Sequence, residues 1–177
     1  MTDKKEQILF VALELFANEG FKGVPTSKIA KQAGVSEGLI FRHFTNKQGL
    51  LEAILGLAVE KTKTIFKPII AEMDPKKVLE KTILFPFSIK KDEYHFWKLQ
   101  FKLKWELELS GKEKMQPLID KLAWAFRELN YKNSEQEAVM LNHIIESVSG
   151  GILKEGLETQ LALKDFLLNK YDITPKN

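Results

Sequence analysis

An all-α fold with about nine helices is predicted for this chain of 177 residues, because apolar residues recur three and four positions apart through most of it. Helix start and stop signals, such as Asp74-Pro75 and Gly156, separate these apolar runs. One stretch is strand-like, since apolar and polar residues alternate strictly from Trp97 to Leu109. We interpret it as a helix because it lacks β-branched residues, is rich in Leu, Lys, Glu and Gln, and has no partner strand.

Two short helices joined by a tight turn are predicted within residues 25–44. Thr26 or Ser27 is expected to cap the first helix, because a hydroxyl oxygen accepts a bond from an unpaired N–H of the first turn. Gly34 is expected to end that helix, where a positive φ costs little. Ser36 is expected to cap the second helix.

Each of these two helices is predicted to have an inner and an outer face. The inner positions are apolar and fall at helical spacing: Ile29, Ala30, Ala33, Ile40 and Phe44. The outer positions of the second helix are Glu37, Gly38, Leu39, Phe41, Arg42 and His43. A surface that mixes a guanidinium, an imidazole and an aromatic ring is suited to phosphates and base edges.

Further helices are expected on both sides of this pair. A helix over residues 3–19, closed by Gly20, precedes it. Thr45-Asn46-Lys47-Gln48 fits a capping box and predicts a fourth helix, which should end near Phe66 because Pro68 limits it. The later helices are expected at apolar runs that begin near Asp74, Asp92, Leu118, Ser134 and Leu161, with breaks at Gly111 and Gly156 and a second capping box at Ser134.

Composition indicates an ordinary globular protein, since 44% of the residues are hydrophobic and the formal charge is only +3. Residues 1–50 carry seven cations and five acidic side chains, which is mild support for a basic surface there. The absence of cysteine excludes disulfides, thiolate metal sites and cysteine nucleophiles. No signal-peptide core and no apolar stretch of about 18 residues is present, so a cytoplasmic protein without membrane contact is expected.

Residues 8–55 resemble the N-terminal DNA-binding domain of the tetracycline-repressor-like (TetR) family of bacterial regulators, with IAKQAGVSEGLIFRHFTNKQGLLEAIL as the matching run. An AGVS turn, an aromatic-x-His-Phe ending and a following Lys-x-x-Leu-Leu occur together at the family's spacing. The resemblance implies a helix-turn-helix DNA-binding domain over residues 1–47, with its motif at about 25–44, and a helical effector-binding and dimerisation domain over residues 48–177.

The resemblance also implies which residues meet DNA: Thr26, Ser27, Ser36, Gly38, Leu39, Phe41, Arg42, His43 and Lys47. Hydroxyls, helix N-termini and Lys47 suit phosphates, whereas Arg42 suits a guanine edge, with a phosphate clamp as its equal alternative. Leu39 and Phe41 suit thymine methyl groups. Phe41 stands where the family usually has tyrosine, so it lacks the hydroxyl that would bond a phosphate.

The C-terminal part offers candidates for two further surfaces. Aromatic residues at helical spacing suit either an apolar ligand pocket or the core, and the pocket candidates are Phe66, Tyr94, Trp97, Phe101, Trp105 and Trp124. Small and apolar residues suit a two-fold interface or a close crossing within the chain, and the interface candidates are Ile144, Ser147, Val148, Gly151 and Phe166.

The leading hypothesis is a homodimeric repressor that a small apolar or aromatic ligand, of a kind the sequence does not name, releases from a double-stranded DNA operator. A regulator that works mainly through a protein partner is the alternative. An enzyme is disfavoured, because the three histidines lie far apart and no cofactor motif is present. His143 and Glu146 lie one turn apart, but a pair without further ligands is weak support for a metal, so neither metal nor cofactor is expected.

Overall fold

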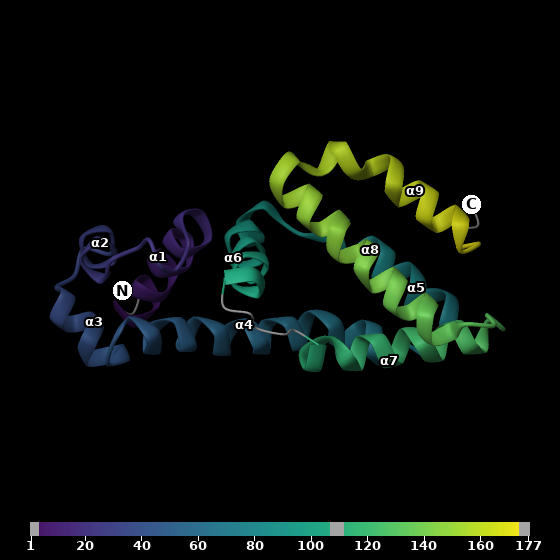
Figure 1. Ribbon diagram of the computed structural model, residues 1–177, viewed down its shortest axis with the longest axis horizontal. Coiled ribbons are helices and arrows are strands. Elements are labelled where there is room, and N and C mark those ends of the chain that lie inside the picture. Colours follow the sequence, from purple (N-terminus) through teal and green to yellow (C-terminus); the bar gives the residue numbers. More distant parts are fainter. Residues whose placement is uncertain (1–3, 107–111, 174–177) are drawn as a thin grey trace. The chain divides into compact units, whose positions relative to one another are not determined.

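The computed structural model describes residues 4–106 and 112–173, without the side chains of 103–106 and 112–114 (Figure 1). In the described residues the predicted all-α fold is confirmed, since they form nine α-helices, three short 3-10 helices and no strand. The α-helices are α1 Lys4–Glu19, α2 Thr26–Gln32, α3 Glu37–Phe44, α4 Lys47–Ile70, α5 Pro75–Leu84, α6 Tyr94–Glu106, α7 Lys112–Glu128, α8 Ser134–Glu155 and α9 Leu161–Lys170. The 3-10 helices are η1 Phe85–Ser88, η2 Lys91–Glu93 and η3 Leu157–Gln160.

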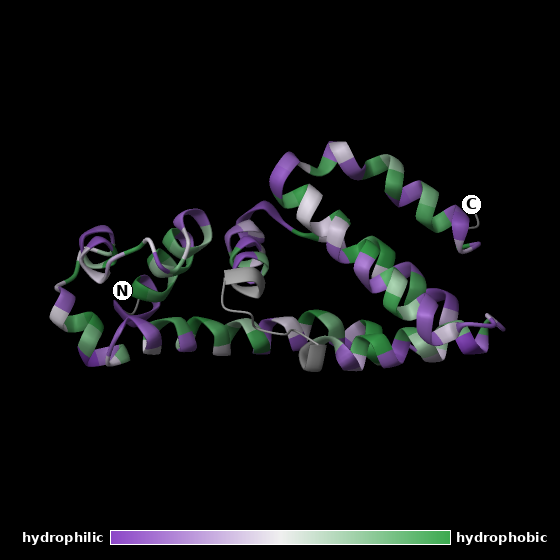
Figure 2. Cartoon of the chain, in the orientation of Figure 1, coloured by the Kyte–Doolittle hydropathy of each residue, from purple (hydrophilic) through white to green (hydrophobic). Residues whose placement is uncertain are grey.

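The stretch with strand-like alternation is helical, because α6 runs through it as far as Glu106. The expected break at Gly111 lies outside the described residues. Most helices carry both hydrophilic and hydrophobic residues along their length (Figure 2). In the part of the chain that the structure describes, no helix has the length and apolar character needed to cross a membrane.

The chain divides into two compact units. The first, which we call the head unit, contains α1, α2, α3, the part of α4 up to Thr62, and α6. The second, which we call the body unit, contains the rest of α4, α5, α7, α8 and α9. The predicted domain boundary after residue 47 would place α6 in the C-terminal domain, whereas α6 lies in the head unit.

Apolar burial holds the head unit together. Its core takes side chains from α1, α2, α3 and α4, among them the fully buried Ile8, Phe16, Ile29, Ile40, Leu50 and Leu51. Leu99 of α6 belongs to the same core and is also fully buried. Two polar contacts join α6 to α1: Lys102 Nζ donates to Asn18 O at 2.6 Å, and His95 Nε2 lies 3.4 Å from Glu14 Oε1. Burial of Leu99 explains why α6 belongs to this unit.

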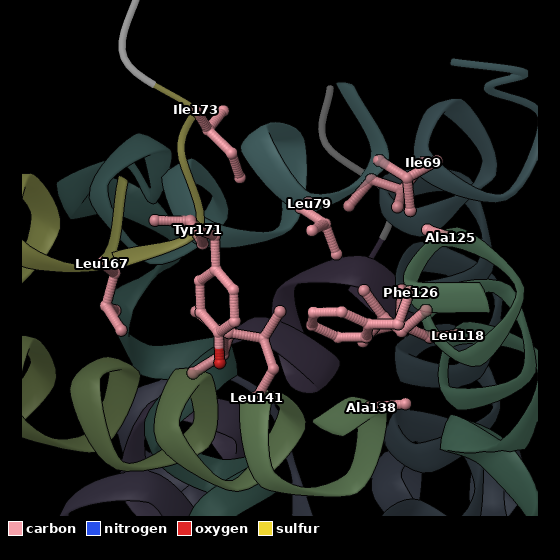
Figure 3. Close-up of a cluster of buried hydrophobic side chains, with 14 of the residues drawn as sticks. Ile69, Leu79, Leu118, Ala125, Phe126, Ala138, Leu141, Leu167, Tyr171 and Ile173 are labelled. Carbon is pink, nitrogen blue, oxygen red and sulfur yellow. The ribbon is translucent and has the colours of Figure 1, made fainter. Parts of the chain in front are cut away.

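The body unit has its own aromatic and aliphatic core, drawn in Figure 3. Phe126 lies at its centre, with the ring centroids of Tyr131 and Tyr171 at 5.0 and 5.5 Å from its own. Burial, followed by the nearby Glu137 carboxylate, raises the pKa of Tyr171 to about 12. Phe66 and Ile69 bring the end of α4 into this core. Helix α4 therefore contributes apolar side chains to both units.

Two expected helix ends are wrong. Neither Thr26 nor Ser27 caps α2, because Pro25 holds the extended N-cap position without a side-chain bond. Helix α4 is not stopped by Pro68, since it continues to Ile70 and the buried Ile69 anchors its last turn. These corrections leave the pattern of elements unchanged.

Both predicted capping boxes are displaced by one residue. At the start of α4 the carboxamide of Asn46 accepts from Gly49 N at 2.8 Å, in the role expected of Thr45. At the start of α8 the N-cap position falls on Asn133, and Ser134 is already helical. The expected cap at Asp74 is confirmed, because its carboxylate accepts from the backbone N–H groups of residues 76 and 77. Gly156 ends α8 with a φ of 99°, also as expected.

Candidate nucleic-acid interface

Helices α2 and α3 meet at a tight turn built from the predicted residues. Gly34 has a φ of 60°, a conformation that costs glycine little, and Val35 N donates to Ala30 O at 3.0 Å to close the turn. Ser36 then caps α3, because its Oγ accepts from Leu39 N at 3.2 Å. This confirms the helix-turn-helix that the sequence predicts.

The inner and outer faces of α3 differ as expected. Ile40 and Phe44 are buried in the head-unit core. On the outer face the side chains of Phe41, Arg42 and His43 are exposed, Phe41 by 43%. Gly38 is exposed beside them with open space where a side chain would stand, and Leu39 is half-buried. Four of the proposed DNA-contacting positions therefore share one accessible surface.

Thr26 and Glu37 form a contact that sequence reasoning missed. The Thr26 hydroxyl, at the start of α2, donates a hydrogen bond to Glu37 Oε1, at the start of α3. A threonine hydroxyl has one proton to donate, so Thr26 does not donate to a phosphate in this arrangement. Spacing alone gives no signal for the bond, because the two residues lie 11 positions apart across a turn. Ser27, the next residue of α2, is exposed.

The proposed phosphate contact Lys47 is partly engaged by its own chain. Its Nζ lies 4.6 Å from the Phe21 ring centroid and donates to Lys22 O at 3.4 Å. The ring orients the ammonium group, and the long distance to the carbonyl indicates a weak bond. Lys28 of α2 instead forms an ion pair with Glu19 of α1, at 2.6 Å. The first turn of α4 thus carries a cation with a defined position.

The junction between α3 and α4 depends on a glycine. Thr45 adopts a φ of 66°, and the next helix begins two residues later. A Cβ atom on Gly49 would lie 2.1 Å from Phe44 O, far inside any normal contact. The last turn of α3 and the first turn of α4 therefore approach each other closely. Sequence reasoning missed this requirement, because glycine at that position carries no turn signature.

The candidate ligand residues divide between the two units. Phe66 and Trp124 belong to the body unit, where Phe66 is buried and Trp124 packs against the same core under Lys121, whose Nζ lies 3.7 Å from its ring centroid. Tyr94, Trp97 and Phe101 lie on α6 in the head unit, Trp97 buried and the other two half-buried. Trp105 is also in α6, but its side chain lies outside the described set.

The candidate dimer residues on α8 differ in exposure. Ser147 is exposed and Ile144 half-buried, and both line a shallow apolar hollow on α8 together with Glu135, Gln136, Val139, Met140 and His143. Val148 is buried within its own chain. Gly151 faces the Gln160 side chain, which a Cβ would approach to 2.9 Å. Phe166 of α9 is 61% exposed.

Part of the head unit matches a known sequence family. The family described as "Bacterial regulatory proteins, tetR family" matches residues 8–54, which run from α1 into α4 and include the whole helix-turn-helix. Residues 8–54 therefore match the DNA-binding domain of the TetR family. The resemblance carried by the AGVS turn and the residues around it is thereby confirmed.

Two similar proteins can be named. The "Uncharacterized HTH-type transcriptional regulator YerO" of Bacillus subtilis is 35% identical over 100 residues, 54% of this chain and 34% of the relative. The "Fatty acid metabolism regulator protein" of the same organism is 29% identical over 163 residues, 90% of this chain and 75% of the relative. The match to YerO thus spans only about a third of that relative's length.

A solved structure extends the likeness beyond the helix-turn-helix to the fold of nearly the whole chain. The transcriptional regulator FadR from Bacillus subtilis, in complex with stearoyl-CoA, superimposes with a TM-score of 0.69 at 21% identity. The superposition covers 97% of this chain and 99% of FadR. The body unit therefore has a fold found in TetR-family regulators, although its sequence carries no family motif.

Proposed function

We propose that this TetR-family regulator binds a specific two-fold DNA operator as a homodimer and acts as a repressor that a small apolar or aromatic ligand releases. The observation that carries the proposal is the outer face of α3. Phe41, Arg42 and His43 are exposed together on a helix whose opposite face is locked into the core by Ile40 and Phe44. A rigid helix with a forked cation on its free face suits the major groove of DNA.

Roles within this surface follow from side-chain chemistry. Arg42 can give two parallel bonds to guanine O6 and N7, a contact worth about 1–3 kcal/mol of discrimination. Ser36 accepts from Leu39 N, which leaves its own proton for a phosphate oxygen. Lys47, placed over Phe21, supplies a phosphate contact from the start of α4. Gly38 permits the close approach of the DNA backbone, since nothing stands within 4 Å of its missing side chain.

The apolar hollow on α8 supports the homodimer. Val139 and Met140 are each 41% exposed there, and Leu163 and Phe166 of α9 are exposed by 42% and 61%. Exposed large apolar side chains on two consecutive helices are typical of an interface that a second copy covers. Two copies would present two α3 helices to two half-sites about 34–36 Å apart.

An apolar effector is supported by one relative and by the composition of the body unit. The relative named for fatty acid metabolism covers 90% of this chain, and the FadR structure of similar fold holds stearoyl-CoA. Helix α4 runs unbroken from the head-unit core to the body-unit core, so a ligand that favours one arrangement of the body core can bias the head through it. Stearoyl-CoA is the first probe, and an effector that binds without changing DNA affinity contradicts release by ligand.

The test of DNA recognition is selection of bound duplexes from a randomised library, followed by affinity measurements for wild type and Arg42→Ala. We expect an enriched two-fold site bound at least ~10³ tighter than scrambled DNA. Arg42→Ala should weaken that site roughly 5- to 150-fold and relax one base position if the arginine reads guanine. Loss that is equal for all sequences would assign Arg42 to a phosphate. Absence of any enriched site would favour action through a protein partner.

A further inference from the structure

Glu37 is an unusual residue for a surface that approaches a polyanion. It is the first residue of α3 and the one acidic residue in that helix, EGLIFRHF. Phosphates repel a carboxylate, so a purely electrostatic DNA contact gains nothing from it. A carboxylate at this place therefore suggests a role that depends on its hydrogen-bonding chemistry.

The structure fixes the orientation of this carboxylate. Thr26 donates its hydroxyl proton to Glu37 Oε1, which joins the start of α2 to the start of α3. Glu37 is half-buried, so the residue keeps partial access to solvent. An ionised carboxylate offers about four acceptor sites, and Thr26 uses one of them. The rest of the group remains an acceptor held in one place.

Base edges differ in how they meet such an acceptor. In the major groove cytosine shows only a donor, its N4 amino group, whereas guanine shows acceptors at N7 and O6. Glutamate and aspartate accordingly accept from cytosine N4, and they oppose bases that show acceptors. A carboxylate that is already oriented loses less conformational freedom when it makes this bond.

We propose that Glu37, oriented by Thr26, is a specificity residue that selects cytosine at one position of the operator by accepting a hydrogen bond from the N4 amino group. This inference rests on the proposed DNA-binding function. It assigns to Thr26 the positioning of Glu37, in place of the phosphate contact that the sequence suggested. Arg42 would then recognise guanine and Glu37 would recognise cytosine, from different turns of α3.

The test compares base preferences among four proteins. Duplexes selected by wild type, Glu37→Gln, Thr26→Val and Glu128→Gln are sequenced, and affinities are measured for operator variants at each position. Glu128 is exposed on α7 in the body unit, so Glu128→Gln makes the same change of net charge away from α3. Thermal unfolding of each variant confirms that the head unit remains folded.

Wild type should prefer cytosine at one position in each half-site, and Glu37→Gln should lower that preference roughly 5- to 150-fold. Part of the preference should shift to adenine, because a carboxamide pairs with adenine N6 and N7. Thr26→Val should weaken the same preference by a smaller factor, and Glu128→Gln should leave it unchanged.

Two results overturn the inference while the proposed function stands. One is an enriched site whose base preferences are the same for Glu37→Gln and wild type. The other is a loss of preference at every position together, which would show that Glu37 only braces the two helices. A wild-type protein that enriches no site overturns the proposed function itself, and this inference with it.

Discussion

Replacement of Gly49 by alanine should loosen the junction between α3 and α4. A Cβ atom there would lie 2.1 Å from Phe44 O and 3.2 Å from Phe44 C, whereas real contacts of this kind stay above 3.0 Å. The Phe44 carbonyl, at the end of α3, would have to move by at least about 0.9 Å. Because overpacking against a backbone costs about 1–3 kcal/mol and alanine gains about 1 kcal/mol of helix propensity over glycine, we expect a net loss of stability of up to about 2 kcal/mol.

Gly56 provides a matched control in the same helix. It is exposed, and a Cβ atom there would meet nothing within 4 Å. Gly56→Ala should therefore raise the free energy of unfolding by about 1 kcal/mol, which is the propensity gain alone. Urea unfolding followed by circular dichroism measures both variants, and their midpoints should move in opposite directions. Equal stabilisation by the two alanines would refute the steric argument at Gly49.

Two further predictions concern the body unit. Met140→Lys should convert a dimer to a monomer in sedimentation velocity, because it places a charge in the apolar hollow on α8. The control Met73→Lys, at a methionine that is 76% exposed, should leave the dimer intact. A dimer that survives Met140→Lys contradicts the assignment of this surface. Glu72 accepts from Lys81 Nζ at 2.6 Å and from Asp74 N at 3.1 Å, and these bonds, with one from the next backbone N–H, lower its pKa to about 2. A carboxylate with a lowered pKa in the folded state stabilises the fold at any pH above its ordinary pKa, and this stabilisation is lost as the pH falls through about 2. The melting temperature of Glu72→Gln should therefore lie below that of wild type at pH 7 and approach it towards pH 2. A difference in melting temperature that does not vary with pH would contradict this.

The helix-turn-helix could be predicted from sequence because its signals are local. Gly34 and Ser36 act where they stand, the first through its own φ and the second through a backbone N–H three residues away. The inner face of α3 likewise follows from the spacing of Ile40 and Phe44 along one helix. Each of these signals depends on no more than five consecutive residues, and all of them are confirmed.

Signals that depend on competing partners were less predictable. Thr26 has the right chemistry for an N-cap, yet its hydroxyl bonds Glu37 and Pro25 holds the cap position. At the start of α4 both Thr45 and Asn46 suit a cap, and the positive φ of Thr45 leaves the role to Asn46. Which of two adjacent polar residues caps a helix is decided by the incoming backbone, and the sequence does not specify that path.

The membership of α6 in the head unit shows why the body of this protein is harder to read than its head. Leu99 looks like any leucine of an apolar helix, but it is fully buried in a core whose other members lie before residue 55. Periodicity identifies the buried face of a helix, whereas the neighbour that covers the face is set by tertiary contacts between distant segments. For the same reason the sequence grouped the aromatic residues of α6 with Phe66 and Trp124 as candidates for one ligand pocket. The structure places α6 in the head unit and Phe66 and Trp124 in the body unit. A shared helical period does not show that two aromatic residues face the same cavity. Binding measurements on variants of each unit are therefore the way to locate a ligand site in this chain.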